Sequence, residues 1–85
     1  MRRKTLIDEI VRFCFDYGLF AKYKTVNVRE IKKKMVNQLK DSAFIEDLIN
    51  TIIVTTKEHE VIDAQRVKNL LSELEKIRLA LEYGE

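Results

Sequence analysis

DAQRVKNLLSELEKIRLALE, residues 63–82, is the most regularly patterned stretch of this 85-residue sequence. Its apolar residues recur at steps of three, four, three and four, a spacing that places side chains on one face of an α-helix. The members of this seam are Val67, Leu70, Leu74, Ile77 and Leu81, with Leu71 beside them. We therefore predict a long amphipathic C-terminal helix that begins near Asp63 or, by an earlier capping signal, near Thr55.

Two interpretations of this seam stay open. In a small helical bundle it faces the chain's own core, whereas in an oligomer or complex it contacts another chain. A domain of this size buries a small core, so association with another chain is a common source of stability. We expect a protein partner or a homo-oligomer, and the candidate interaction seam is Val67, Leu70, Leu71, Leu74, Ile77 and Leu81.

The chain upstream of this helix contains few helix breakers, because it has no proline and its only glycine before residue 84 is Gly18. A first helix is predicted from Thr5 to Gly18, where glycine suits the left-handed residue that follows many helices. Apolar residues cover more than half the circumference of this segment. That coverage favours a central position in the core.

Two further helix starts are marked by capping residues. Asn27 followed by Glu30 has the spacing of a capping pair and predicts a second helix over about 28–40. Asp41 or Ser42 is expected to cap a third helix, because short oxygen-bearing side chains bind the first free N–H groups of a helix.

Residues 51–63 allow two predictions. The run TIIVTT, residues 51–56, is rich in β-branched residues and could pair with residues 60–63 in a hairpin. The alternative, which we favour, continues the third helix through this run. The sequence then predicts one all-α domain over residues 1–85, a compact bundle of three to four helices.

Charge is divided unevenly between the two halves of the chain. Residues 1–40 carry eleven Lys or Arg and four Asp or Glu, a net of +7, whereas residues 41–85 carry five and ten, a net of −5. The overall charge of +2 conceals this separation. Such asymmetry indicates an anionic partner at one end, or head-to-tail association.

The basic half concentrates its cations on the predicted second helix. At about 100° per residue, four of its cations fall within an arc of about 100° beside the apolar stripe. Just upstream, Phe20 and Tyr23 are interleaved with lysines, a combination that suits base stacking beside a phosphate track. The candidate nucleic-acid-binding residues are Lys22, Lys24, Arg29, Lys32, Lys33 and Lys40. The alternative interpretation is a solvated helix face with no ligand.

The stretch VNVREIKKKM, residues 26–35, resembles the second helix of many winged-helix domains. With the possible hairpin at residues 51–63 as a wing, that resemblance implies a dimeric DNA-binding regulator. The usual turn glycine after this helix is missing, and the following helix carries Asp41, Glu46 and Asp47 where a groove-binding helix needs neutral or basic residues.

The composition argues against an enzyme. His59 and Cys14 are the only residues of their types, too few for a zinc site within one chain. Two glycines cannot form a glycine-rich phosphate loop. We expect no catalytic residue, metal, cofactor or small-molecule substrate, and no membrane span, because acidic and basic residues interrupt the apolar runs. The lone cysteine favours a reducing, cytoplasmic setting.

These observations predict a non-catalytic accessory or regulatory subunit that acts by protein–protein interaction. We expect it in a nucleic-acid-handling assembly, for replication or transcription, with the basic N-terminal half toward nucleic acid. The alternatives are the winged-helix-type regulator and a small antagonist that binds another protein without nucleic acid.

Overall fold

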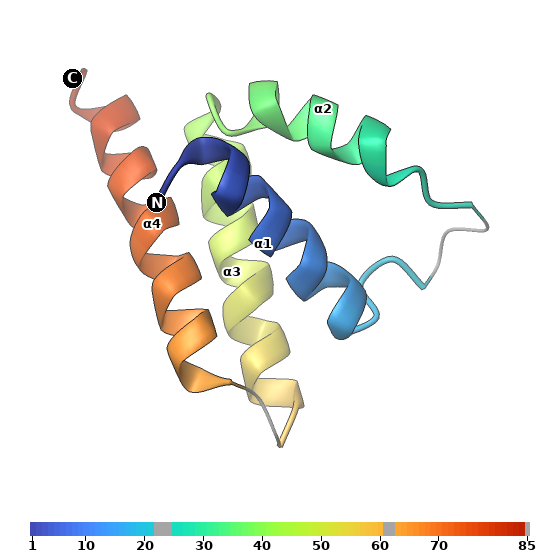
Figure 1. Ribbon diagram of the computed structural model, residues 1–85. Coiled ribbons are helices and arrows are strands. Elements are labelled where there is room, and N and C mark those ends of the chain that lie inside the picture. The colour runs from blue at the N-terminus through green and yellow to red at the C-terminus, as the bar shows by residue number, and fades with distance from the viewer. Residues whose placement is uncertain (22–24, 61–62, 85) are drawn as a thin grey trace.

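In the computed structural model, which describes residues 1–21, 25–60 and 63–84, helices account for all the regular secondary structure. They are α1 (Arg3–Asp16), α2 (Val28–Gln38), α3 (Ser42–Glu58) and α4 (Ala64–Glu82) (Figure 1). The all-α prediction is confirmed, and α4 is the longest helix with 19 residues. No helix among these residues is both long and apolar enough to cross a membrane.

Three of the four helix starts are set by the caps that the sequence predicts. The side chain of Asn27 accepts a hydrogen bond from Glu30 N at 3.2 Å. Asp41 accepts one from Ala43 N at 3.0 Å, and Asp63 accepts one from Arg66 N at 3.1 Å. Each carboxylate or amide oxygen satisfies an N–H that has no partner within its helix. The later of the two predicted starts of α4, at Asp63, is therefore correct.

The first helix begins two residues before the predicted start. Arg2 precedes it without a side-chain cap, and Leu6 N already donates to Arg2 O at 2.9 Å. The reason lies in packing, because the full burial of Leu6 stabilises this first turn. At the other end Gly18 has φ +70°, and Leu19 N donates to Cys14 O at 2.8 Å. This is the glycine-terminated helix end that the sequence predicts.

The hairpin alternative is wrong for residues 51–58, which lie within α3. Three threonines in this run donate their hydroxyls to carbonyl oxygens four residues earlier, at 2.8–2.9 Å. The polar groups of the run are thereby satisfied inside the helix, and Ile52 is buried against the core. Residues 61–62 of the hairpin prediction lie outside the described residues. The second helix ends at Gln38, two residues before its predicted end.

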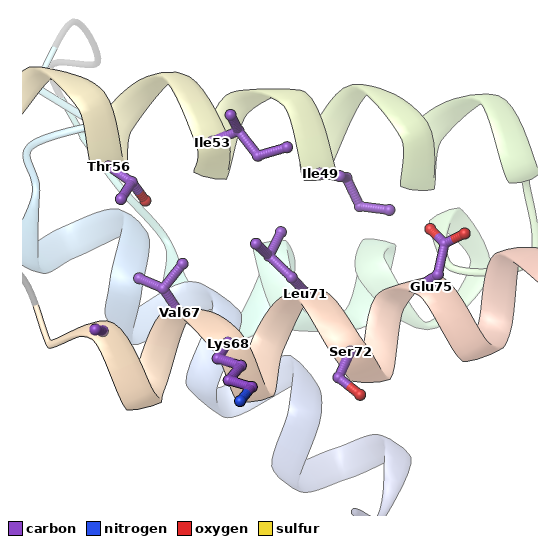
Figure 2. Close-up of a pocket in the computed structure, with 9 residues that line it drawn as sticks. Ile49, Ile53, Thr56, Val67, Lys68, Leu71, Ser72 and Glu75 are labelled. Carbon is purple, nitrogen blue, oxygen red and sulfur yellow. The ribbon is translucent and has the colours of Figure 1, made fainter.

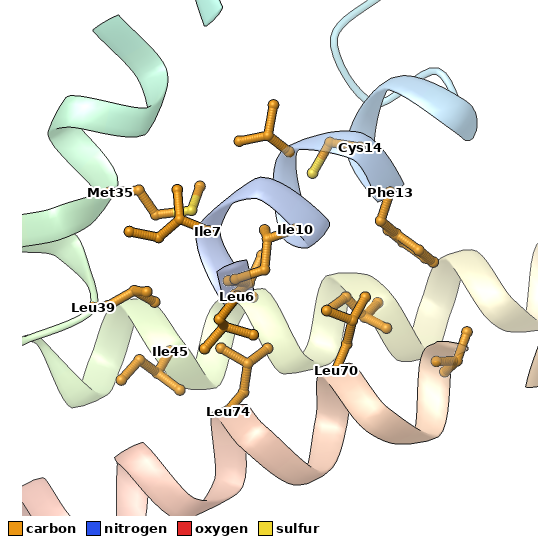
Figure 3. Packing of buried hydrophobic residues seen from close by; sticks show 14 residues of the cluster. Leu6, Ile7, Ile10, Phe13, Cys14, Met35, Leu39, Ile45, Leu70 and Leu74 are labelled. Atoms are coloured by element: carbon orange, nitrogen blue, oxygen red, sulfur yellow. The ribbon is translucent and has the colours of Figure 1, made fainter. Parts of the chain in front are cut away.

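The core is built around α1, which supplies more buried residues than any other described helix. It contacts α2 and α4, while α3 and α4 run antiparallel along each other (Figure 1). Figure 3 shows Leu74 of α4 pointing toward Leu6 of α1, with Met35 of α2 near Ile7. Because α1 is the shared element, it sets the position of α2 relative to the α3–α4 pair. That placement leaves one edge of α2 beside the first turns of α1.

Candidate nucleic-acid interface

A groove of about 780 Å³ lies between α1 and α2. Basic side chains dominate its lining, with five cations against two carboxylates. Its lining residues are Arg3, Lys4, Ile7, Asp8, Arg29, Glu30, Lys32, Lys33 and Val36. Apolar atoms of Ile7 and Val36 complete the lining, so the groove combines a hydrophobic surface with surrounding positive charge.

The α2 side of this groove follows from the amphipathic pattern of that helix. Met35 and Leu39 are buried and orient the helix against the core. Arg29 and Lys33, four residues apart, then lie on one exposed row of the helix surface. Two of the predicted cations are thus brought together at the groove, and Lys32 joins them.

The α1 side was not identified from the sequence. Arg3 and Lys4 line the groove because α1 begins at Arg3 rather than Thr5 and carries both side chains on its first turn. The basic run at residues 2–4 was the available signal. This run joins the cations of α2 only because α1 packs against α2. That packing is a tertiary contact, and no pattern of neighbouring residues in the sequence predicts it.

One ion pair crosses the groove. Lys32 Nζ lies 3.0 Å from Asp8 Oδ1, with both side chains partly exposed. A second hollow, of about 370 Å³, adjoins the groove at these same two residues and extends along α1 toward the exposed Phe15. Lys32 is therefore partly neutralised. Among the described residues the other four cations of the groove form no ion pair: Arg3, Lys4, Arg29 and Lys33.

The remaining predicted cations lie elsewhere. Lys40 is exposed beyond the end of α2 and does not line the groove. Lys22 and Lys24 fall outside the described residues, as does the intervening tyrosine. The basic surface that the structure assembles thus consists of three predicted residues and two that were not predicted.

Most of the predicted interaction seam on α4 lies in the core. Val67, Leu70 and Leu74 are buried, and Leu71 and Ile77 are partly buried against the same cluster. Leu81, at 40% exposure, is the one member of the seam that stays open to solvent. Most of the seam therefore packs within this chain, as in the interpretation in which it faces the chain's own core. It does not form a continuous exposed apolar face.

The single cysteine and the single histidine of the chain have different surroundings. Cys14 is buried, and this burial raises the pKa of its thiol to about 11. The ring of His59 instead lies 4.8 Å from that of Tyr17. Within the part of the chain that the structure describes, no three His, Cys, Asp or Glu residues gather where they could hold a metal ion.

Comparison of the chain with protein-family models, with curated proteins and with solved structures finds no match. We therefore infer the function from the chemistry of the groove itself. Guanidinium and ammonium groups around an open groove suit a ligand with several negatively charged oxygens, because each unneutralised cation attracts an anion and donates hydrogen bonds to it.

Proposed function

We propose that this chain is a non-catalytic accessory or regulatory subunit that contacts the nucleic-acid backbone through the groove between α1 and α2. The observation that carries the proposal is the convergence of basic side chains from two helices on one groove, four of which form no ion pair with any residue that the structure describes.

Phosphate contacts account for such a surface better than contacts to base edges. The cations come from side chains along two helices rather than from one helix shaped to enter a major groove. Backbone contacts position a protein on nucleic acid without reading its sequence. We therefore expect binding with little sequence preference, to DNA or RNA, as befits an accessory subunit.

The opposite charge of the C-terminal half supports a second contact, with protein. Residues 41–85 carry a net charge of −5, of which −2 falls within α3, +1 within α4 and −4 on residues outside these two helices, namely Asp41, Glu60, Asp63 and Glu85. An acidic surface is repelled by phosphate and attracted to basic protein surfaces. The chain would then lie between nucleic acid and a basic partner within a replication or transcription assembly.

The test is binding to labelled single- and double-stranded DNA at low salt, measured by fluorescence anisotropy. We expect a dissociation constant tighter than roughly 10⁻⁵ M. The double variant Arg29→Glu/Lys33→Glu should weaken binding at least tenfold, because it reverses the charge at two of the four groove positions that form no ion pair among the described residues. The control Lys34→Glu/Lys76→Glu changes the net charge equally with residues that do not line the groove.

Each outcome has a definite meaning. Loss of binding in the groove variant alone supports the proposal, whereas equal loss in both variants reduces the effect to net charge and contradicts it. Strong sequence preference would favour the dimeric DNA-binding regulator instead. Undetectable binding to either form of DNA and to RNA would leave the small protein-binding antagonist.

A further inference from the structure

A second groove, of about 580 Å³, lies between α3 and α4 and shares no lining residue with the basic groove. Figure 2 shows Leu71 pointing into the space between the two helices, with Ile49 and Ile53 across from it on α3. Its lining residues are Ile49, Ile53, Thr56, Ala64, Val67, Lys68, Leu71, Ser72 and Glu75. Ile53 is 36% exposed, and the neighbouring Val54 is 51% exposed. Ile53 and Val54 thus add exposed apolar surface at and beside this groove.

The charged residues of this groove are placed symmetrically along α4. Lys68 precedes Leu71 by three residues, and Glu75 follows Ser72 by three. The two charges are seven residues apart, or about 10 Å along the helix axis. A second α4, antiparallel to the first and centred on the same point, places its Glu75 opposite Lys68 and its Lys68 opposite Glu75.

The edge of α3 carries the same polarity. Lys57 follows Ile53 by four residues, and Glu46 precedes Ile49 by three, so both lie on the rows of the helix surface that border the groove. Because α3 and α4 are antiparallel, Lys57 shares one end of the groove with Lys68. Glu46 shares the other end with Glu75.

Glu75 is held as a carboxylate by its neighbour on α4. Arg78 Nε donates to Glu75 Oε2 at 3.1 Å, and Arg78 also pairs with Glu82. The hydrogen bonds from Arg78, followed by its charge, hold the pKa of Glu75 below its ordinary range. Glu75 therefore stays ionised at neutral pH, and its negative charge is partly offset by Arg78 in the way that Asp8 offsets Lys32.

We propose that the groove between α3 and α4 binds a second copy of this chain, related by a two-fold axis that passes beside Leu71 and Ser72. The two α3–α4 pairs then form a four-helix layer. The apolar side chains of Ile49, Ile53 and Leu71 are covered at its centre, and the lysine end of each groove faces the glutamate end of the other. A surface that complements itself in this way is the requirement for a closed two-fold dimer.

The size of this face sets the expected affinity. A helix of 17 residues, the length of α3, spans about 26 Å, and two adjacent helices are about 20 Å wide. The face therefore covers about 500 Å² in projection on each partner, near the lower limit for specific interfaces. We expect a dimer with a dissociation constant in the micromolar range, because only the surplus over the cost of association appears as affinity.

The test exploits the symmetry of the charges. Lys68→Glu and Glu75→Lys each place like charges opposite one another twice in the homodimer. Each variant alone should dimerise about tenfold more weakly than the wild type, from two attractive pairs turned repulsive. When the two variants are mixed, every position 68 faces a position 75 of opposite charge, so the heterodimer should recover wild-type affinity. Sedimentation velocity gives the affinities, and native mass spectrometry identifies the mixed dimer.

Matched controls use charges on other helix faces. Lys76→Glu and Glu58→Lys make the same charge changes outside the groove and should dimerise like the wild type, alone or mixed. Because breaking the contact between Glu75 and Arg78 can affect α4, circular dichroism checks that each variant stays helical. Ile53→Glu supplies a second disruption at an exposed position, and it should abolish the dimer without unfolding the chain.

Three results would overturn the proposal. One is a wild-type chain that stays monomeric at about 500 µM, well above the expected micromolar range. Another is full dimerisation of both single charge variants. The third is a mixture of the two variants that associates no better than either alone. None of these readouts involves nucleic acid, so they are independent of the proposed function.

Discussion

Replacing Leu74 with alanine tests whether the heptad pattern of α4 belongs to the core of one chain. Leu74 is 0% exposed, and in Figure 3 it points toward Leu6 of α1. Removing a fully buried leucine side chain costs about 3 kcal/mol, from lost burial and the cavity left behind. A domain of this length has a total stability of about 4–13 kcal/mol. Leu74→Ala should therefore remove a quarter or more of it.

The matched variant is Leu81→Ala, seven residues along the same seam but 40% exposed. It should cost about 1 kcal/mol or less, because 40% of the Leu81 surface already contacts water and no closed cavity is left behind. In thermal unfolding followed by circular dichroism, Leu74→Ala should lower the midpoint by about 12–24 °C, and Leu81→Ala by a few degrees. Measurement at submicromolar concentration, below the expected dissociation constant of the proposed dimer, keeps the chain largely monomeric. Equal shifts for the two variants would refute the assignment of this seam to the core.

Three other predictions concern single contacts. Arg66→Ala should lower the free energy of unfolding by about 1 kcal/mol in denaturant titration. Arg66 pairs with Asp16 at 2.7 Å and lies 5.7 Å from the ring centre of Phe13, and alanine loses both contacts. Arg66→Lys should keep part of this stability. Asn27→Ala should cost about 1 kcal/mol and lower helicity modestly, while Asn27→Asp should be nearly neutral. Since burial raises the pKa of the Cys14 thiol from 9.0 to about 11, the folded state disfavours the thiolate. The neutral thiol's contribution to the free energy of unfolding is fully present below pH 9 and is lost as the pH rises toward 11. Over that interval the wild type should therefore lose about 2 kcal/mol of stability relative to Cys14→Ala.

Helix boundaries proved the most predictable part of the molecule, because caps depend on residues close in sequence. Asn27, Asp41 and Asp63 each bind an N–H group two or three residues ahead, so the spacing alone indicated the contact. The start of α1 has no side-chain cap and depends on the burial of Leu6, a tertiary effect. That is why its first turn was not predicted.

The basic groove was half predictable for a related reason. The cations of α2 share a helix face and could be grouped by their spacing, whereas Arg3 and Lys4 join them only because α1 packs beside that face. The pairing of Lys32 with Asp8 also crosses between helices, and it removes one cation from the predicted set. Charge patterns within a helix are local, but their neutralisation depends on the fold.

The apolar seam shows the limit of periodicity. Its spacing identifies one face of α4 correctly but carries no information on what covers that face. In the structure Val67, Leu70 and Leu74 are buried in the core, whereas Leu71 is only partly buried and lines the groove between α3 and α4. The groove beside Leu71 needs side chains from α3 as well, so no single-helix pattern indicated it.

The salt dependence of DNA binding tests the central claim most directly. Four cations of the groove form no ion pair within the described part of the chain. If each releases one condensed counterion from duplex DNA, the logarithm of affinity falls with the logarithm of salt concentration with a slope of about −3.6. Arg29→Gln/Lys33→Gln removes two of them and should reduce the slope to about −1.8. A wild-type slope near zero, or a slope that this double variant leaves unchanged, would contradict the assignment of the groove between α1 and α2 as the nucleic-acid interface.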